Sequence, residues 1–537
     1  MSGFSRFLSN LCGDDKMRAL QKVYEQSSKE FRANLEERAR SIEEFTGPEG
    51  MLLGLTPSQD DEGLNIRIPW GRENARWLIQ GGTGTGKTTW QIQLFEQKFP
   101  KGFCGGIDCK GDLHPNLVRV IAGCGLKLDR EAREALRSRL LVVDPFSSAL
   151  VPLNICRVLP GYTAEFQAYE LALVLRRLFQ GDLTAHAENL LRHLLLLLME
   201  AGLSLVEAPM LLQNEVLRSV LAMRNQNAGV KEFFLRAYSS LPQVSKDSLL
   251  NRLQALLLPE NIRLMLGAND LIDLRSAFEE GKLLLVFLGK GLSIPEEQVN
   301  VLGSLILQMV FQATYARVHG KRQSYLLMID EFVNLLEGTA LANRFATALT
   351  AARSFGLHLM LSHHSFVQVP SALRQTVLAN ADLISVFRTS AESAAAFGDF
   401  MPESDIEQMT KAYAAGRCLS KTEIKGYQLE SIQRLPNREF FWYDRRHINR
   451  SIRLRTPEFI PPHLRLRISE KRFEELIEEQ GWTCGSAGIR REELRRQIAD
   501  RQERLQQMLR PSIDVRPDSE PENKGKPQGK SRRPRLG

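Results

Sequence analysis

The run GGTGTGKTT, from Gly81 to Thr89, constrains the fold of this chain more than any other feature. The apolar stretch Trp77-Leu78-Ile79 comes shortly before it, and the helix-favouring segment WQIQLFEQ follows it. A strand, a glycine-rich turn and a helix in this order form a loop whose backbone N–H groups point at bound phosphate. The run therefore predicts a phosphate-binding loop in an α/β fold.

Within this loop the chemistry assigns two side chains a definite role. Lys87 would reach the β- and γ-phosphates of a nucleotide, and the hydroxyl of Thr88 would bind Mg²⁺. The predicted nucleotide-binding residues are Gly81, Gly82, Thr83, Gly84, Thr85, Gly86, Lys87, Thr88 and Thr89.

Composition places the chain among globular proteins. Of its 537 residues, 43% are hydrophobic and 25% charged, which allows a large core and several domains. The net charge of +8 suits a polyanionic partner. The most apolar run, LLRHLLLLLME, contains Arg192 and His193 and is too short to span a membrane, and no signal peptide is evident. Scattered cysteines without a CxxC pair favour reduced thiols, so we expect a cytoplasmic protein without a transmembrane segment.

Continuous apolar runs predict a buried, mainly parallel sheet. Most of them end in Asp, Gly or Ser, and they are RWLIQ, GFCGGID, RLLVVD, KLLLVFL, YLLMID, GLHLMLS and DLISVFR. Between the third and fourth runs, residues 161–275 are rich in Leu, Ala, Glu and Arg at helical spacing. We therefore predict an all-α domain inserted into an α/β core.

The predicted organisation has six segments. They are a helical N-terminal extension (1–50), the first part of the core (51–160), the inserted all-α domain (161–275), the second part of the core (276–460), a charged helical extension (461–510) and a basic tail (511–537). The tail is rich in Pro, Lys and Gly and poor in apolar residues, which predicts disorder.

A second motif supplies the acidic groups that a phosphate-binding loop needs. The strand YLLMID ends in Asp330, and Glu331 follows it. We expect Asp330 to hold Mg²⁺ and Glu331 to polarise an attacking water, which implies hydrolysis. The alternative is an acidic strand end that caps a helix.

Other polar residues at predicted strand ends have more than one interpretation. Asp108 and Asp144 would lie at the carboxyl edge of the sheet, where ligands gather, yet turn formation explains them equally well. Arg353 and Arg388 lie at strand boundaries, where each could be an arginine finger or a surface arginine.

The histidine pair after GLHLMLS also has two interpretations. Neighbouring strand residues point to opposite faces, so we expect that His363 and His364 cannot bind one metal ion together. One of them would instead sense the γ-phosphate or the attacking water.

The ordered set of motifs resembles a known family. It comprises the phosphate-binding loop, DCKGDL (108–113), VVDP with Asn154, MIDEF (328–332), ARSFGLHLMLSHHS (352–365) and ANADLISVFR (379–388). This set is similar to the TraD/TraG-type coupling proteins of type IV secretion, in the FtsK/HerA clan of ring-shaped DNA-pumping ATPases. The resemblance covers residues 55–460.

The resemblance implies a RecA-like P-loop NTPase core that binds ATP and Mg²⁺ and forms a homohexamer. It implies that Asp330 and Glu331 form the Walker B pair and that Arg353 enters a neighbouring subunit's site. The expected function is ATP-driven, sequence-independent DNA translocation in conjugative or mobile-element transfer. A relaxase or secretion channel would be the protein partner, met through the inserted domain.

Two departures from the family leave alternatives open. His364 stands where the family usually has glutamine, and it would sense the γ-phosphate in its place. The chain also lacks the family's N-terminal membrane helices, so recruitment to a membrane complex would replace direct anchoring. The alternatives to DNA translocation are a motor for protein secretion or assembly, and a nucleotide-dependent scaffold with weak hydrolysis.

Overall fold

The computed structural model of the chain describes eight ranges of residues. They are 42–57, 63–176, 184–289, 294–317, 322–336, 339–397, 421–447 and 451–509. Most of the predicted N-terminal extension (1–50) and the whole predicted tail (511–537) lie outside these residues.

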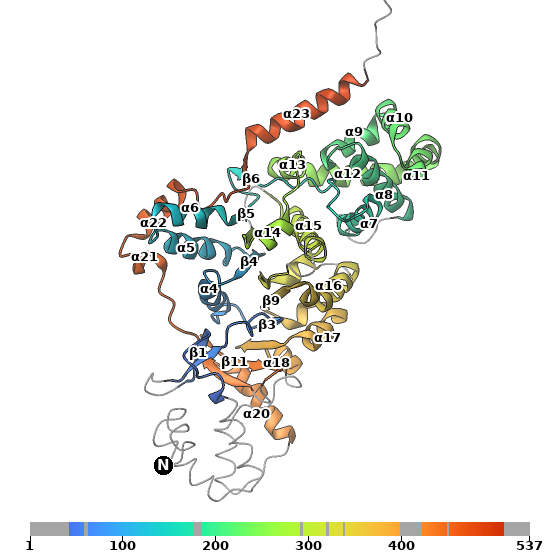
Figure 1. The fold of residues 1–537 in the computed structure, drawn as a ribbon. Helices are drawn as coiled ribbons and strands as arrows, with labels where there is room; N and C mark the ends of the chain where they lie inside the picture. Colours follow the sequence, from blue (N-terminus) through green and yellow to red (C-terminus); the bar gives the residue numbers. More distant parts are fainter. Residues whose placement is uncertain are drawn as a thin grey trace, which may run out of the picture.

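One large mixed sheet forms the centre of the protein (Figure 1). It has 11 strands in the order β2-β1-β12-β11-β10-β3-β9-β8-β4-β7-β5. The strands are β1 (Met51–Leu55), β2 (Asn65–Ile68), β3 (Trp77–Gln80), β4 (Phe103–Asp108), β5 (Leu140–Val143), β7 (Leu283–Phe287), β8 (Tyr325–Asp330), β9 (Leu357–His363), β10 (Leu383–Phe387), β11 (Glu439–Asp444) and β12 (Ile452–Arg455).

The parallel half of this sheet, from β10 to β5, consists of the strands that the apolar runs predict. The antiparallel half, β11, β12, β1 and β2, was not predicted. In β12 the side chains alternate between buried and exposed, with Arg453 and Arg455 facing out. A strand with one solvated face lacks the continuous apolar run on which the prediction rested.

The two faces of the parallel strands contribute to two different hydrophobic cores. Leu326 and Met328 of β8 pack in the core that includes α4 and α5, while Leu327 and Ile329 pack in the core that includes α15 and α16. This alternation follows from the period of two in a strand. Both faces are therefore covered by helices, as a parallel sheet requires.

The helices of the core flank this sheet on its two sides (Figure 1). They are α4 (Lys87–Lys98), α5 (His114–Gly125), α6 (Arg130–Ser138), α14 (Leu274–Glu279), α15 (Glu296–Tyr315), α16 (Thr339–Ala351), α17 (Ser371–Asn380), α18 (Ala391–Phe397) and α20 (Lys421–Gln433). Within the residues that the structure describes, no helix is long and apolar enough to cross a membrane.

The segment predicted to be all-α is helical in its described part. It holds α7 (Ala164–Leu175), α8 (Ala185–Glu200), α9 (Ala208–Gln213), α10 (Glu215–Arg224), α11 (Ala228–Glu232), α12 (Gln243–Leu257) and α13 (Glu260–Leu266). Short turns of 3-10 or π helix connect some of these helices: η2 (Leu205–Glu207), η3 (Phe233–Ala237) and η4 (Tyr238–Ser240). Figure 1 shows this group beside one end of the sheet, with α7 next to α15.

The C-terminal part returns to both the core and the helical group. Its helices are α21 (Pro462–Arg465), α22 (Glu470–Glu479) and α23 (Arg491–Gln507), and β13 (Ile489–Arg490) pairs antiparallel with β6 (Ala149–Leu150). The predicted apolar side of α23, with Leu494, Ile498 and Leu505, is buried.

A buried ion pair fixes α23 to the helical group. The Nε of Arg501 lies 3.1 Å from Oε1 of Glu207, and both side chains are almost inaccessible to solvent. An Nη2–H of Arg501 also donates to the carbonyl oxygen of Gly267 at 2.7 Å. Helix α23 is therefore part of the folded unit and not a separate extension.

Replacing Arg501 should destabilise this attachment, because it leaves the Glu207 carboxylate buried without its partner. We expect Arg501→Ala to lower the free energy of unfolding by about 3 kcal/mol and to raise hydrogen exchange in α23. The control Arg496→Ala removes an exposed pair with Glu493 and should cost less than about 0.5 kcal/mol. Equal effects of the two variants in urea unfolding would contradict this assignment.

Candidate functional site

The loop from Gly81 to Lys87 connects the carboxyl end of β3 to the start of α4, as the sequence predicts. Gly84 and Gly86 have φ angles of 76° and 105°, in the left-handed region that glycine adopts without strain. The Nζ of Lys87 donates to the carbonyl oxygens of Gly81 at 2.5 Å and Gly82 at 3.1 Å. The lysine therefore lies across the loop, with its ammonium group held by the loop's own carbonyl oxygens.

The other predicted loop residues differ in exposure. Thr83, Gly84 and Thr89 are exposed, Gly82, Gly86 and Thr88 are partly buried, and Thr85 is buried. The hydroxyl of Thr85 donates to the carbonyl oxygen of Gly82 at 2.8 Å, which closes the turn from within. Burial lowers the pKa of Lys87, whereas the charges of Glu331 and Asp330 oppose that shift.

Residues distant in sequence hold the loop from outside. The backbone N–H of Arg438 donates to the carbonyl oxygen of Thr85 at 2.9 Å, and Arg438 has the unusual φ of 71°. On the other side, the N–H of Gly82 donates to the carbonyl oxygen of Arg388 at 2.7 Å. Strand β10 and the approach to β11 therefore position the loop.

Asp330 is the last residue of β8, which lies two strands away from β3, the strand that leads into the phosphate-binding loop. The register pairs Asp330 with Ser362 of β9 and, on the other side, with Asp108 of β4. The hydroxyl of Ser362 donates to Oδ1 of Asp330. Burial raises the pKa of Asp330 to about 7, and the charges of Glu331 and Asp108 add to this shift, while Ser362 and Lys87 oppose it.

Glu331 follows Asp330 in a strained backbone conformation. Its φ of 54° lies in the left-handed region, which costs a residue with a side chain about 1 kcal/mol. This turn at the strand end directs the carboxylate toward β9. Although burial raises the pKa of Glu331, interactions with His363 and His364 lower it to about 2.

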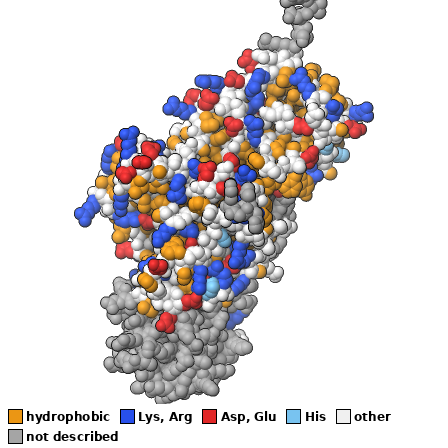
Figure 2. All heavy atoms as spheres, in the orientation of Figure 1, with side chains coloured by type: hydrophobic (Ala, Val, Ile, Leu, Met, Phe, Trp, Pro, Cys, Tyr) orange, Lys and Arg blue, Asp and Glu red, His pale blue; other side chains and the backbone are white. Residues whose placement is uncertain are grey.

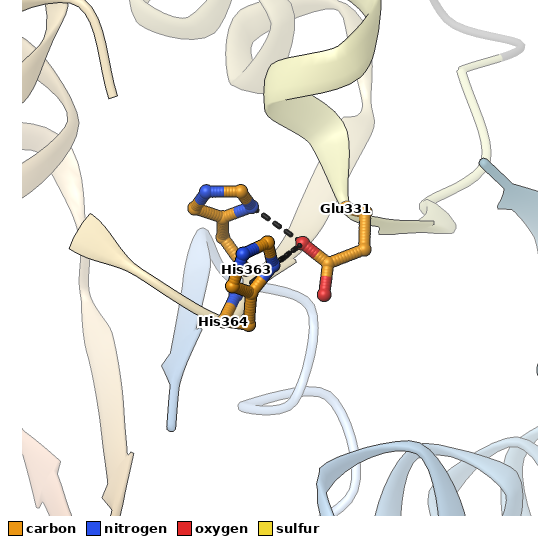
Figure 3. A group of neighbouring side chains, drawn as sticks. All are labelled: Glu331, His363 and His364. Atoms are coloured by element: carbon orange, nitrogen blue, oxygen red, sulfur yellow. Dashed lines mark hydrogen bonds and ion pairs between the residues drawn. The ribbon is translucent and has the colours of Figure 1, made fainter. Parts of the chain in front are cut away.

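The two histidines meet at one carboxylate oxygen (Figure 3). The Nδ1 atoms of His363 and His364 lie 2.5 Å and 2.8 Å from Oε2 of Glu331. The expectation that the two side chains point to opposite faces of the sheet is therefore wrong. Strand β9 ends at His363, and His364 already belongs to the following bend, where the alternation of strand side chains no longer applies.

Turn formation accounts for Asp108 and Asp144. The Oδ1 of Asp108 accepts from the N–H groups of Lys110 and Gly111, and its Oδ2 accepts from those of Leu113 and His114. This carboxylate thereby caps the entry to α5. Asp144 accepts the N–H of Phe146 at 2.8 Å in a similar local turn.

The two arginines lie at opposite edges of the sheet, not at equivalent positions as the sequence suggests. Arg353 is in η6 (Ala352–Phe355), just before β9, and is 51% exposed, 3.9 Å from Asp382. Arg388 follows β10 at the carboxyl edge, where its Nη2–H donates to Asn437 at 2.7 Å. Arg353 is therefore separated from its own phosphate-binding loop by the length of a strand.

The site also contains groups that sequence reasoning missed or undervalued. Ser362 binds Asp330, the backbone of Arg438 holds the loop, and His363 is as close to Glu331 as His364 is. The Nε2 of His363 lies 3.2 Å from Oε1 of Gln368, in η7 (Phe366–Gln368). The run Ser-His-His-Ser (362–365) could have indicated Ser362 and His363 from the sequence. Nothing near Arg438 in the sequence indicates its contact with the loop.

Comparison with known proteins reveals similarity at the level of structure. VirB4 of Thermoanaerobacter pseudethanolicus matches with a TM-score of 0.50 and 12% identity, over 78% of this chain and 98% of that chain. The plasmid coupling protein TrwB, in complex with a non-hydrolysable ATP analogue, matches with a TM-score of 0.50 and 16% identity, over 79% and 93%. No protein-family model matches the chain, and no curated protein matches its sequence.

These likenesses establish the fold. The chain shares the α/β architecture of VirB4 and TrwB across most of its length, and the predicted fold class is confirmed.

The raised pKa of Asp330 gives a pH-dependent prediction. Between about pH 4 and pH 7 the folded chain holds a proton that the unfolded chain has lost, so rising pH costs stability. Asp330→Asn imitates the protonated acid and should stabilise the nucleotide-free protein more at pH 8 than at pH 5, by about 2 to 3 kcal/mol. Thermal unfolding at the two pH values measures this difference.

The matched control is Asp112→Asn, which alters an exposed carboxylate at the same sheet edge. Its effect on stability should hardly change between the two pH values. A pH-independent effect of Asp330→Asn would show that the carboxylate is not held in the buried environment described above.

Proposed function

We propose that this chain is an ATPase that moves DNA, similar in action to a coupling protein of conjugative or mobile-element transfer. The observation that carries the proposal is the meeting of Lys87, Asp330 and Glu331 at one edge of one sheet. A phosphate-binding loop beside two strand-end carboxylates is the arrangement that holds and hydrolyses a nucleoside triphosphate.

The residues present fit Mg²⁺ together with ATP. Asp330 is a buried carboxylate near two further carboxylates, so a cation would relieve its repulsion. The Thr88 hydroxyl and the Asp330 carboxylate would hold the ion, and Lys87 would exchange its two carbonyl partners for phosphate oxygens. Bound Mg²⁺ supplies charge neutralisation on the phosphates.

Glu331 is the group that we propose to activate water. Its backbone is turned at the end of β8, and its low pKa keeps the carboxylate ionised. Loss of a histidine contact would raise that pKa and make the carboxylate a stronger base toward water. His364, with its side chain 41% exposed, is the group that we propose to sense the γ-phosphate in place of glutamine. Its contact with Glu331 would couple that sensing to the position of the base.

The cargo is proposed from the family resemblance and from the name of one structure. TrwB is described as a plasmid coupling protein. Figure 2 shows basic side chains interspersed with acidic ones on the described part of the face that it draws. We propose that loops inside a homohexameric ring contact the DNA without regard to sequence.

Arg353 is proposed to act between subunits. It is exposed at the edge opposite the phosphate-binding loop, so in a ring with head-to-tail interfaces it would face a neighbour's nucleotide.

A relaxase or secretion channel is the proposed protein partner. Protein cargo and a weakly hydrolysing scaffold are the two competing proposals.

Hydrolysis with and without nucleic acid tests the main proposal. We expect ATP turnover in the wild type to be stimulated several-fold by DNA. Lys87→Ala and Glu331→Gln should each lower turnover by at least about 100-fold, since they remove the phosphate cation and the base. Turnover indifferent to single- and double-stranded DNA would favour protein cargo, and equal, near-zero rates in the wild type and Glu331→Gln would favour the scaffold.

Mixing two inactive variants tests whether Arg353 acts in trans. Arg353→Ala and Lys87→Ala should each be inactive alone, because each lacks one half of the site. In a random equal mixture, roughly one quarter of the interfaces pair an intact Lys87 with an intact Arg353, so activity should reappear. Arg72→Ala, which alters another surface arginine, is the control and should keep full activity. Failure of the mixture to recover turnover would contradict action in trans.

A further inference from the structure

We propose that Glu331, His363 and His364 form a binding site for a borderline divalent transition-metal ion, with Zn²⁺ as the representative. One oxygen and two imidazole nitrogens converge there, and the three donor atoms lie within 4.8 Å of one another (Figure 3). Two histidines and one carboxylate are the ligand set of several zinc sites that leave a further position open.

The tautomer of His363 supports a cation at this point. Its Nε2 lies 3.2 Å from Oε1 of Gln368, an oxygen that only accepts, which places the ring proton on Nε2. Unless the ring carries a second proton, its Nδ1 atom then directs a lone pair at Oε2 of Glu331, 2.5 Å away. Two acceptor atoms at that separation repel each other unless a positive charge lies between them.

Burial strengthens this argument. The side chain of His363 is only 2% exposed, and its Nδ1 has no hydrogen bond of acceptable geometry despite the short distance to Glu331. An unsatisfied buried nitrogen aimed at a buried carboxylate is costly. Gln368 meanwhile fixes the ring in the manner of an outer-shell partner of a metal ligand.

The required adjustment is small. Zinc binds nitrogen and oxygen at about 2.0 to 2.2 Å, so tetrahedral donor atoms are about 3.3 Å apart. The Nδ1 atoms of His363 and His364 lie 2.5 Å and 2.8 Å from Oε2 of Glu331, so each pair must separate by less than about 1 Å. Half-exposed His364 can move outward, whereas enclosed His363 requires the Glu331 carboxylate to draw back. Imidazole ligands favour Zn²⁺ over Mg²⁺, which distinguishes this site from the proposed magnesium position at Thr88 and Asp330.

Zinc binding by the full-length chain without nucleotide tests the proposal. A chromogenic chelator competing for Zn²⁺, with Mg²⁺ in large excess, gives the number and affinity of bound ions. We expect one ion at this site in the wild type and at least a tenfold weaker affinity in His364→Gln. Any zinc bound by cysteines would be bound equally by the wild type and His364→Gln. The difference in zinc affinity between these two proteins therefore reports on the Glu331, His363 and His364 site alone.

His447→Gln is the matched control, since it removes an exposed histidine outside the cluster and should bind Zn²⁺ as the wild type does. Glu331→Gln is the second test variant and should also weaken binding at least tenfold. Affinity unchanged in both His364→Gln and Glu331→Gln, or displacement of the ion by Mg²⁺, would overturn the proposal.

The consequence for activity rests on the proposed function, whereas the binding test does not. An ion on Oε2 would occupy the oxygen that Glu331 needs to accept a proton from water. Zinc would then inhibit hydrolysis without competing with ATP.

Discussion

The register of four parallel strands is the constraint on which the candidate site depends. Strands β4, β8, β9 and β3 are aligned so that Asp108, Asp330, Ser362 and Ile79 are successive register partners across the sheet, with Gln80 beside His363 one residue further. A shift of one residue in β8 would turn the Asp330 side chain to the other face of the sheet. The alternating packing of that strand into two cores prevents such a shift, so hydrophobic packing fixes the position of the chemistry.

That edge gathers negative charge, and its carboxylates are stabilised differently. Asp108 is satisfied by four backbone N–H groups, and Glu331 lies against two imidazoles and is hydrogen-bonded by that of His364, whereas Asp330 is left with one hydroxyl and a pKa raised to about 7. The least satisfied carboxylate is thus the one best suited to Mg²⁺. Asp108 is already committed to turn structure, whereas Glu331 faces the histidine pair.

Most of the parallel half of the fold could be predicted because each strand is buried on both faces and forms a continuous apolar run. Strands β2 and β12 escaped prediction because solvated side chains interrupt that pattern, as Arg453 and Arg455 do in β12. Strands β1 and β11 are apolar for most of their length and were overlooked. At the site, the sequence indicates Lys87, Asp330 and Glu331 through local motifs. The contacts of Arg438 and of the histidine pair depend on tertiary packing and on where a strand ends, which no local motif records.

The strained backbone of Glu331 determines which groups its carboxylate contacts. A left-handed φ places its carboxylate against His363 and His364, where the Nδ1 of His364 is hydrogen-bonded to it. A base that activates water must give up part of this pairing, and it would do so only when another group compensates. His364 is the partner that can leave, since it is half-exposed and lies beyond the last residue of β9, whereas His363 is enclosed. The buried histidine therefore fixes the position of the base, and the exposed one is free to respond to what binds beside it.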